Sequence, residues 1–560
     1  MFLPTSREEI KRLSWKKLDI IIVTGDTYLD SPYIGAAVIG KVLFAAGYKV
    51  GIIAQPDLNS EIDITRLGEP AIFWGITAGS VDSMVANYTA LKKKRRKDDF
   101  TPGGENTKRP NRATIVYCNL IKKYFKNTKP LVLGGIEASL RRITHYDYWD
   151  DKIRKSILFD SKADILIYGM GEKSVLELAE KLESGEDFKK IRGLCYISPQ
   201  PQEGFIILPS YQEVQEDKQK FITMFHDFYL NNDPLTAKGL CQKQDSRYLI
   251  QNPPNYPLSQ KRLDQIYDLD YEREVHPYYR KEGKVKALET IKFSIPTHRG
   301  CYGDCNFCSI AVHQGRTIQQ RSEKSILKEV KLLASMKDFK GYILDLGGPT
   351  ANMYGIECQK KLKLGSCPNK RCLYPQICAN LQINHQAQIE ILKKIRKIKG
   401  IKKVFVASGI RYDMLLEDQK YGEEYLRELI KHHISGQLKI APEHIEDNVL
   451  EKMGKPDQGY LKKFKDKFFQ INKELKKKQF LTYYLIAAHP GCKEEDMQRL
   501  KKFTSQELKI NPEQVQIFTP LPSTYSTLMY YTEIDPFNQK LIFVEKNLKK
   551  KERQKEIVVK

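Results

Sequence analysis

The chain of 560 residues is longer than one hydrophobic core usually serves, so two or more domains are expected. Hydrophobic residues make up 41% and charged residues 29%, which is the balance of a soluble protein. The longest strongly apolar stretches, such as LDIIIV and YILDLGG, are far shorter than the roughly 20 residues of a membrane-spanning helix, and the charged N-terminal segment excludes a secretory signal. We therefore expect a cytoplasmic protein without a membrane partner.

The net charge of +24 has two interpretations. A nucleic-acid partner would need many Lys and Arg side chains for its phosphates. However, much of the lysine lies in stretches such as EILKKIRKIKGIKK, where it alternates with apolar residues at helical spacing. This pattern favours lysines on solvated helix faces over a dedicated nucleic-acid surface.

Residues 1–200 predict a doubly wound α/β domain of Rossmann-like type. Short apolar runs that end near glycine recur along this part, and helical patterns follow several of them: DIIIVTGD, KVGIIAQPD, PAIFWGIT, KPLVLGGIEAS and ADILIYGMGE. Ligands of such sheets bind at the carboxyl ends of the strands, where these glycines lie. Residues 91–114 interrupt the pattern and predict a long basic loop, either a solvated insertion or a flap that contacts an anion or substrate.

The remaining chain predicts a connecting region, a barrel and a tail. Residues 201–290 are mixed and rich in proline, which indicates a connecting region. From residue 291 to 535, about six strand–helix units predict an open or partial (β/α)6 barrel, whose sites gather on the loops after the strands. The lysine-rich segment 536–560 predicts a frayed helical tail.

Seven of the eleven cysteines fall between Cys301 and Cys378, and in a reducing compartment such clustering indicates metal or catalysis before disulfides. Cys301, Cys305 and Cys308 lie within eight residues. An iron–sulfur cube usually takes four cysteines, so three would leave one iron with an open coordination position, where catalysis occurs. A zinc site with a distant fourth ligand is the alternative, although zinc loops favour cysteines paired two to four residues apart.

At this motif the sequence resembles the radical S-adenosylmethionine (SAM) superfamily, whose hallmark is CxxxCxxC after the first barrel strand. From about residue 15 to 535 the chain is similar to the YgiQ-like family, in segments such as GDTYLDSPYIG, GGIEASLRRITHYDYWDD, GGPTANMYG and KIAPEH. The resemblance implies that Cys301, Cys305 and Cys308 hold a [4Fe-4S] cluster whose open iron binds SAM. It also implies reductive cleavage of SAM to a 5′-deoxyadenosyl radical that abstracts hydrogen from a substrate.

The resemblance also implies cofactor-binding positions. Gly347 and Gly348 are expected along the amino group of the methionine moiety, although Pro349 stands where many superfamily members have Glu. Ser408 and Arg411 are expected at the ribose and carboxylate, because an Arg fork binds a carboxylate bidentately. Lys439, Glu443 and His444 are expected at a strand end that faces the cavity, with open roles; His444 is equally interpretable as a structural histidine.

A second cysteine set, spaced x8, x4 and x5, lies in a loop of little apolar content: Cys358, Cys367, Cys372 and Cys378. A metal would cross-link such a loop, and four thiolates would saturate either zinc or a second [4Fe-4S] cluster. A loop without metal is the third interpretation. We expect a metal-pinned lid over the active site.

The first domain resembles the cobalamin-binding domain of some radical enzymes. The signature of such domains is Asp-x-His-x-x-Gly, and the matching segment here is DSPYIG from Asp30 to Gly35, with Pro32 in place of the histidine. Proline cannot ligate cobalt, so we do not expect cobalamin and favour a domain that caps the barrel or recognises substrate.

The sequence thus predicts a radical SAM enzyme of unassigned substrate. It would need an electron donor such as flavodoxin or ferredoxin. Two alternatives remain open at this point: a radical SAM enzyme that modifies RNA, favoured by the net charge, and a non-catalytic iron–sulfur protein that senses redox state or passes electrons.

Overall fold

The computed structural model describes residues 1–560, and the chain divides into two compact units. The first unit contains Met1–Leu258 and Gln265–Lys292, and the second contains Ser259–Asp264 and Phe293–Lys560. Neither unit has a helix with the length and apolar character that a membrane crossing requires.

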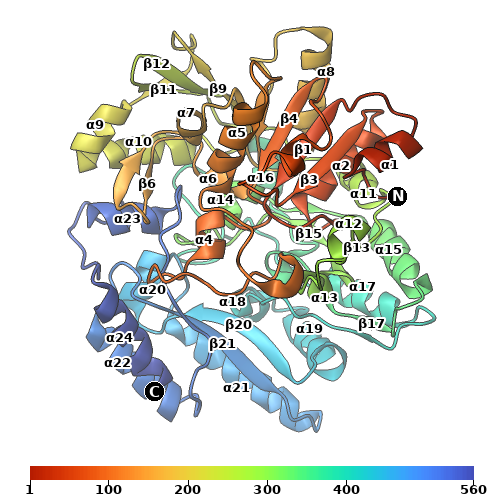
Figure 1. Ribbon diagram of the computed structural model, residues 1–560. Helices are drawn as coiled ribbons and strands as arrows, with labels where there is room; N and C mark the ends of the chain where they lie inside the picture. Colours follow the sequence, from red (N-terminus) through yellow and green to blue (C-terminus); the bar gives the residue numbers. More distant parts are fainter. The chain divides into compact units, whose positions relative to one another are not determined.

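The first unit is built on one nine-stranded sheet in the order β10-β11-β12-β9-β8-β5-β4-β1-β3 (Figure 1). Its parallel part consists of β3 (Val50–Ala54), β1 (Ile20–Thr24), β4 (Phe73–Thr77), β5 (Leu131–Leu133) and β8 (Ile165–Ile167). These strands are apolar runs because helices cover both faces of the sheet, so every residue of β1 is buried. Packed helix pairs include α2 (Gly35–Ala45) with α8 (Glu172–Ser184), and α5 (Ala113–Tyr124) with α7 (Ile157–Ser161). The doubly wound α/β prediction is confirmed.

The strand order places a topological switch point between β1 and β4. The second strand of this sheet in chain order, β3, lies on one side of β1, and β4, β5 and β8 follow on the other side. In doubly wound folds the crevice outside the carboxyl ends of these two central strands is the ligand position.

Residues 201–290 differ from the predicted connecting region. Three strands from this part extend the sheet of the first unit: β10 (Ile206–Leu208), β11 (Leu240–Gln244) and β12 (Arg247–Gln251), and β12 pairs with β9 (Leu194–Ser198). The strands escaped prediction because buried glutamines replace apolar residues in them. Gln242 accepts a hydrogen bond from the Thr144 backbone amide, and Gln244 accepts one from that of Ser156. Only the tertiary structure supplies these partners.

The second unit contains six parallel strand positions in chain order: β14 (Ser294–Pro296), β17 with β18 (Tyr342–Ile343, Asp345–Gly347), β19 (Lys403–Val404), β20 (Gln437–Glu443), β21 (Phe480–Ala487) and β22 (Val515–Ile517). Each pairs in parallel with the next, through β14–β18, β17–β19, the Ile410–Ile440 bridge, β20–β21 and β21–β22. Helices such as α15 (Glu323–Ser335), α17 (Gln386–Arg396) and α21 (Gln458–Glu474) lie between them in the chain. The partial (β/α)6 barrel is confirmed.

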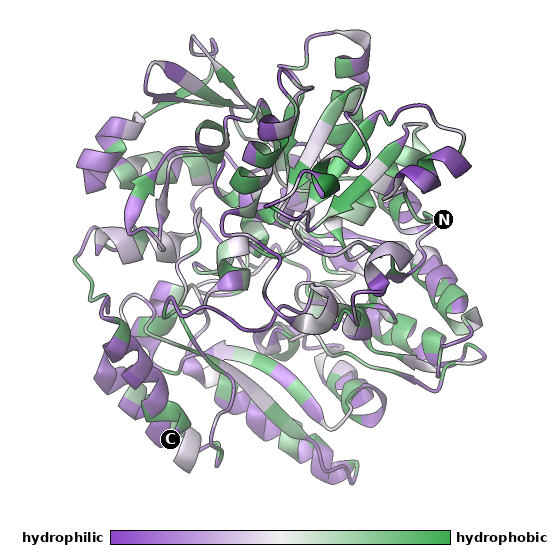
Figure 2. Ribbon diagram, in the orientation of Figure 1, coloured by the Kyte–Doolittle hydropathy of each residue, from purple (hydrophilic) through white to green (hydrophobic).

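Figure 2 shows how apolar and polar residues divide over these elements, with both kinds alternating along α21. Phe464 and Phe468 of this helix are buried in the barrel core. The lysine-rich segment at the C-terminus also differs from the predicted frayed tail, because residues Leu548–Val559 form helix α24, which packs on α22 (Glu494–Gln506) and β22. Gln554 of α24 accepts a hydrogen bond from the Ala488 amide, so the helix is anchored by buried polar contacts.

Candidate cluster site in the second unit

The loop with Cys301, Cys305 and Cys308 lies between β15 (His298–Arg299) and α14 (Ile310–Gln314), and β15 follows the first barrel strand, β14. Gly303 forms the centre of this loop. Its amide donates to the Cys301 Sγ at 3.3 Å, and a Cβ on Gly303 would lie 3.2 Å from that sulfur and 3.6 Å from the Cys305 Sγ. The thiols of Cys301 and Cys305 therefore face one space, which a larger side chain would fill.

The pKa shifts of the cysteines in this loop also indicate that the three thiols lie close to one another. Burial raises the pKa of Cys301 and of Cys308, and the neighbouring Cys305 thiol contributes to both shifts. In the metal-free loop the protonated form is thus favoured, and ligation by these sulfurs must release protons. Three thiols around one space fit an iron–sulfur cluster with one iron free of cysteine.

Arg411 lies beside this space, and its guanidinium is bonded within the protein. Its Nε donates to Asp413 Oδ1 at 2.8 Å and its Nη2 donates to Asp413 Oδ2, so Asp413 occupies the fork that was predicted for a SAM carboxylate. The remaining Nη1 lies 3.7 Å from the Cys305 Sγ. Although burial acts against the charged form, Asp413 holds the pKa of Arg411 above its ordinary value. Arg411 is thus a permanent positive charge next to a thiol.

Gly347 and Ser408 meet at the ends of neighbouring strands. The hydroxyl of Ser408 donates to Asp345, whose other oxygen accepts from the Ser408 amide at 3.1 Å. A Cβ on Gly347 would lie 3.0 Å from the Ser408 Oγ. A Cβ on Gly348 would lie 2.5 Å from the His298 ring, which explains the need for glycine there. Ser408 is already bonded within the protein, so its predicted ribose contact requires the hydroxyl to exchange partners.

The three residues of the KIAPEH segment have different environments. Lys439 is exposed, on the face of β20 opposite the buried Leu438 and Ile440. His444 is buried, its Nδ1 accepts from the Glu446 amide at 3.0 Å, and burial lowers its pKa to about 3, which fits the structural interpretation. Glu443 is buried with positive φ, and its nearest ion-pair partner, Lys455, is 4.0 Å away.

Glu443 is expected to make stability depend on pH. Burial raises its pKa from the ordinary 4.5 to about 7, so the folded protein holds this proton more tightly than the unfolded chain. The contribution is therefore fully present below pH 4.5 and is lost as the pH rises through 7. The test compares the unfolding free energy of cluster-free wild type and Glu443→Gln at pH 5 and pH 8. Because only wild type loses the contribution of Glu443 as the pH rises, the difference in favour of Glu443→Gln should grow by up to about 3 kcal/mol from pH 5 to pH 8. Urea denaturation at the two pH values measures this, and an equal difference at both would contradict it.

The second cysteine set also comes together. All four residues line one pocket, to which Cys358 contributes from the start of α16 (Gln359–Leu364) and the other three from the loop that follows. The chain contains no group of three or more His, Cys, Asp or Glu side chains placed to hold a single metal ion.

Sequence reasoning missed His298, Asp345 and Asp413. His298 is three residues before Cys301, and Asp413 is two residues after Arg411, so proximity to the motifs was the available signal. Burial lowers the pKa of His298 to about 4, so its ring is neutral at physiological pH.

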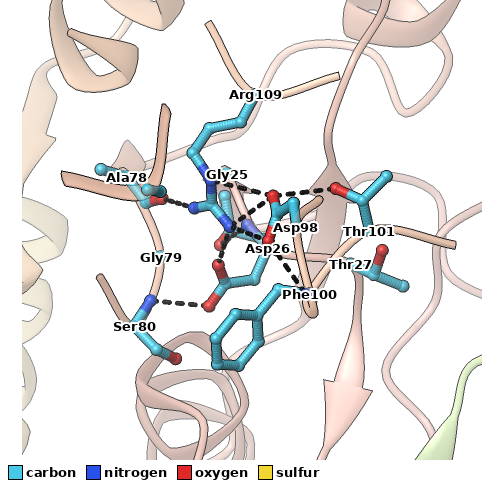
Figure 3. A network of polar contacts seen from close by, with 12 residues as sticks. Gly25, Asp26, Thr27, Ala78, Gly79, Ser80, Asp98, Phe100, Thr101 and Arg109 are labelled. Carbon is cyan, nitrogen blue, oxygen red and sulfur yellow. Dashed lines mark hydrogen bonds and ion pairs between the residues drawn. The ribbon is translucent and has the colours of Figure 1, made fainter. Parts of the chain in front are cut away.

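In the first unit, a network of charged side chains lies at the switch point between β1 and β4 (Figure 3). Asp26 follows β1, and its Oδ1 accepts from the Arg109 Nη2 at 2.8 Å, while its Oδ2 accepts from the Ser80 amide at 2.6 Å. Arg109 also donates to the Ala78 carbonyl at 2.5 Å and to Asp98 Oδ2. Asp98 and Arg109 belong to the basic insertion 91–114, which is therefore neither fully solvated nor a free flap.

Comparison with known families gives consistent matches over the chain. The radical SAM N-terminal model matches residues 2–294, and the radical SAM superfamily model matches residues 295–504. A UPF0313 protein of Fusobacterium nucleatum is 62% identical over 558 residues, which cover 100% of this chain and 98% of the relative. A UPF0313 protein of Thermotoga petrophila is 51% identical over 562 residues, with coverage of 100% and 98%.

Two solved structures share the fold at low identity. The radical SAM methyltransferase TsrM from Kitasatospora setae, with cobalamin and a [4Fe-4S] cluster bound, aligns with a TM-score of 0.53 and 14% identity over 91% of this chain and 74% of TsrM. The cobalamin-dependent SAM radical enzyme OxsB, with aqua-cobalamin bound, aligns with a TM-score of 0.51 and 12% identity over 95% of this chain and 57% of OxsB.

Proposed function

Because the chain belongs to the UPF0313 family of the radical SAM superfamily, we propose that it cleaves SAM reductively and takes a hydrogen atom from a substrate with the resulting 5′-deoxyadenosyl radical. A [4Fe-4S] cluster held by Cys301, Cys305 and Cys308 would supply the electron and an iron without a cysteine ligand for SAM. The observation that carries the proposal is the close approach of two of these thiols to Gly303.

The chain's own residues have positioning roles in this proposal. Arg411, held by Asp413, keeps a positive charge 3.7 Å from the Cys305 sulfur. Asp345 fixes Ser408 against Gly347, which sets the backbone beside the expected SAM position. Glu443, with a pKa of about 7, can hold or release a proton near neutral pH.

The direct test is anaerobic incubation of the iron- and sulfide-reconstituted protein with SAM and dithionite. Formation of 5′-deoxyadenosine, measured by chromatography, is the expected result. An intact cluster with no 5′-deoxyadenosine would contradict the proposal and favour an iron–sulfur sensor. In the cell the electron would come from a donor such as flavodoxin or ferredoxin.

We do not expect cobalamin to be part of this function, although the two solved neighbours carry it. Asp26 and Arg109 are both buried at the switch point, and a Cβ on Gly79 would lie 2.2 Å from the Asp26 carboxylate. The segment in the position of the cobalamin signature begins at Asp30, the last residue of β2 (Leu29–Asp30), which pairs with β13 (Glu274–Val275). Its Asp30 is paired with Lys41 at 2.9 Å. These contacts support a first unit whose ligand crevice is filled by its own side chains.

The filled crevice predicts that the wild-type protein does not retain cobalamin. After anaerobic incubation with excess hydroxocobalamin and gel filtration, the protein fraction should contain no cobalt above background by elemental analysis. About one cobalt per chain, with a cobalamin absorption spectrum, would contradict the prediction.

The net charge of +24 favours RNA modification as the second candidate function. Its test is binding of total tRNA at increasing salt, because phosphate contacts give affinity that falls steeply with ionic strength. Affinity that is absent already at low salt would remove this candidate and leave a substrate other than RNA.

A further inference from the structure

The four cysteines of the second set face one pocket in the loop after α16. Cys358 is buried, while Cys367, Cys372 and Cys378 are partly buried. The Cys378 amide donates to the Cys372 carbonyl at 2.9 Å, which closes a loop between two of the four cysteines. Burial raises the pKa of Cys372, and the thiols of Cys358 and Cys378 add to this shift, so these three sulfurs are electrostatic neighbours.

The rest of the pocket lining is mainly basic: Arg316, Lys360, Lys361, Lys370 and Arg371. The Lys361 Nζ lies 3.8 Å from the Cys372 Sγ and lowers the pKa of that thiol against the effect of burial. Both terminal nitrogens of Arg371 are buried without a hydrogen-bond partner. The guanidinium carbon lies 5.4 Å from the centroid of the Tyr525 ring and 5.3 Å from that of Phe537, so aromatic rings contact this cation.

An apolar cluster borders the pocket, and Tyr302 and Leu381 belong to both. Tyr302, Leu373 and Leu381 are buried in one apolar cluster, against which Cys301 of the first set also packs. Residues 358–378 contribute few other apolar side chains, so apolar packing orders this segment only weakly. A cross-link through a thiolate-bound centre would supply the missing order.

The placement of the four cysteines distinguishes a zinc site from an iron–sulfur cube. Zinc in a tetrahedral site would need its four sulfurs about 3.8 Å apart, from a zinc–sulfur distance of about 2.3 Å. The chain has no group placed to hold a single ion in this way. In an iron–sulfur cube each cysteine binds a different iron, so the sulfurs stand further apart around a wider pocket. We propose that Cys358, Cys367, Cys372 and Cys378 hold a second [4Fe-4S] cluster.

The experiment compares metal content in anaerobically purified and reconstituted proteins. Wild type should contain about eight iron and eight sulfide per chain, because each cluster holds four. The variant Cys301/305/308→Ala keeps the second set and should contain about four, with an electron paramagnetic resonance signal after reduction. The variant Cys358/367/372/378→Ala should also contain about four. A matched control, Cys118/195/241→Ala, removes three buried cysteines of the first unit and should keep about eight.

An iron-free Cys301/305/308→Ala protein would overturn the proposal, and so would about one zinc per chain in place of its iron. These outcomes do not depend on the Cys358/367/372/378→Ala variant, which is the most prone to misfolding. The proposal is independent of SAM cleavage. Wild type with about four iron and active SAM cleavage would refute only the second cluster, whereas about eight iron without 5′-deoxyadenosine would refute only the proposed function.

Discussion

Replacement of Cys301, Cys305 and Cys308 by alanine is expected to abolish 5′-deoxyadenosine formation from SAM. The thiols of Cys301 and Cys305 share the space around Gly303, both act on the pKa of the Cys308 thiol, and no other cysteine lies in that loop. Without them no iron is held where SAM is to be cleaved, so the rate should fall to that of the uncatalysed reaction. Chromatographic measurement of 5′-deoxyadenosine after anaerobic incubation with dithionite gives the result.

The Cys118/195/241→Ala variant is the matched control, since it loses the same number of cysteines and should retain activity. Circular dichroism of both variants separates loss of chemistry from loss of fold. Substantial 5′-deoxyadenosine from the Cys301/305/308→Ala protein would show that these residues do not hold the reactive cluster.

Arg411→Met is expected to destabilise the protein by about 3–5 kcal/mol. Arg411 and Asp413 are 7% and 1% exposed, and their side chains form a bidentate ion pair. Removing the guanidinium leaves the Asp413 carboxylate buried without its partner, which is the costly way to break such a pair. Urea denaturation of the cluster-free protein at pH 7 measures the loss.

The double variant Arg411→Met/Asp413→Asn removes both charges and should recover most of that stability. Arg427→Met is the surface control, because Arg427 is 37% exposed and pairs with the exposed Glu474, and it should cost less than about 1 kcal/mol. A loss in Arg411→Met no larger than in Arg427→Met would contradict a buried ion pair that holds the charge beside Cys305.

The sequence predicted the main fold because its strands carry their own signal. Strands such as IIIVT are apolar throughout since helices cover both faces of a parallel sheet. The strands between Ile206 and Gln251 carry no such signal, because Gln242 and Gln244 are buried in them and accept from backbone amides up to 98 residues away. The C-terminal helix was misjudged for a similar reason, as Lys551 is buried and donates to the Tyr530 hydroxyl.

In the candidate site, too, local sequence patterns were predictive and tertiary contacts were not. Spacing alone pointed to the cysteines, because three thiols in one short loop must lie close together. The partners of the other residues were not readable: Asp413 occupies the Arg411 fork, and Asp345 holds Ser408. Arg109 reaches Asp26 across 83 residues, so the filled switch point could not be inferred from the basic composition of its loop.

The central claim is that the three-cysteine cluster has an iron open to SAM. Electron paramagnetic resonance of the reduced, reconstituted protein, recorded with and without SAM, tests it most directly. We expect a [4Fe-4S] signal whose g values shift when SAM is added, and we expect this SAM-sensitive component to be missing in the Cys301/305/308→Ala variant. A reduced protein without signal, or a signal that SAM leaves unchanged, would contradict the claim.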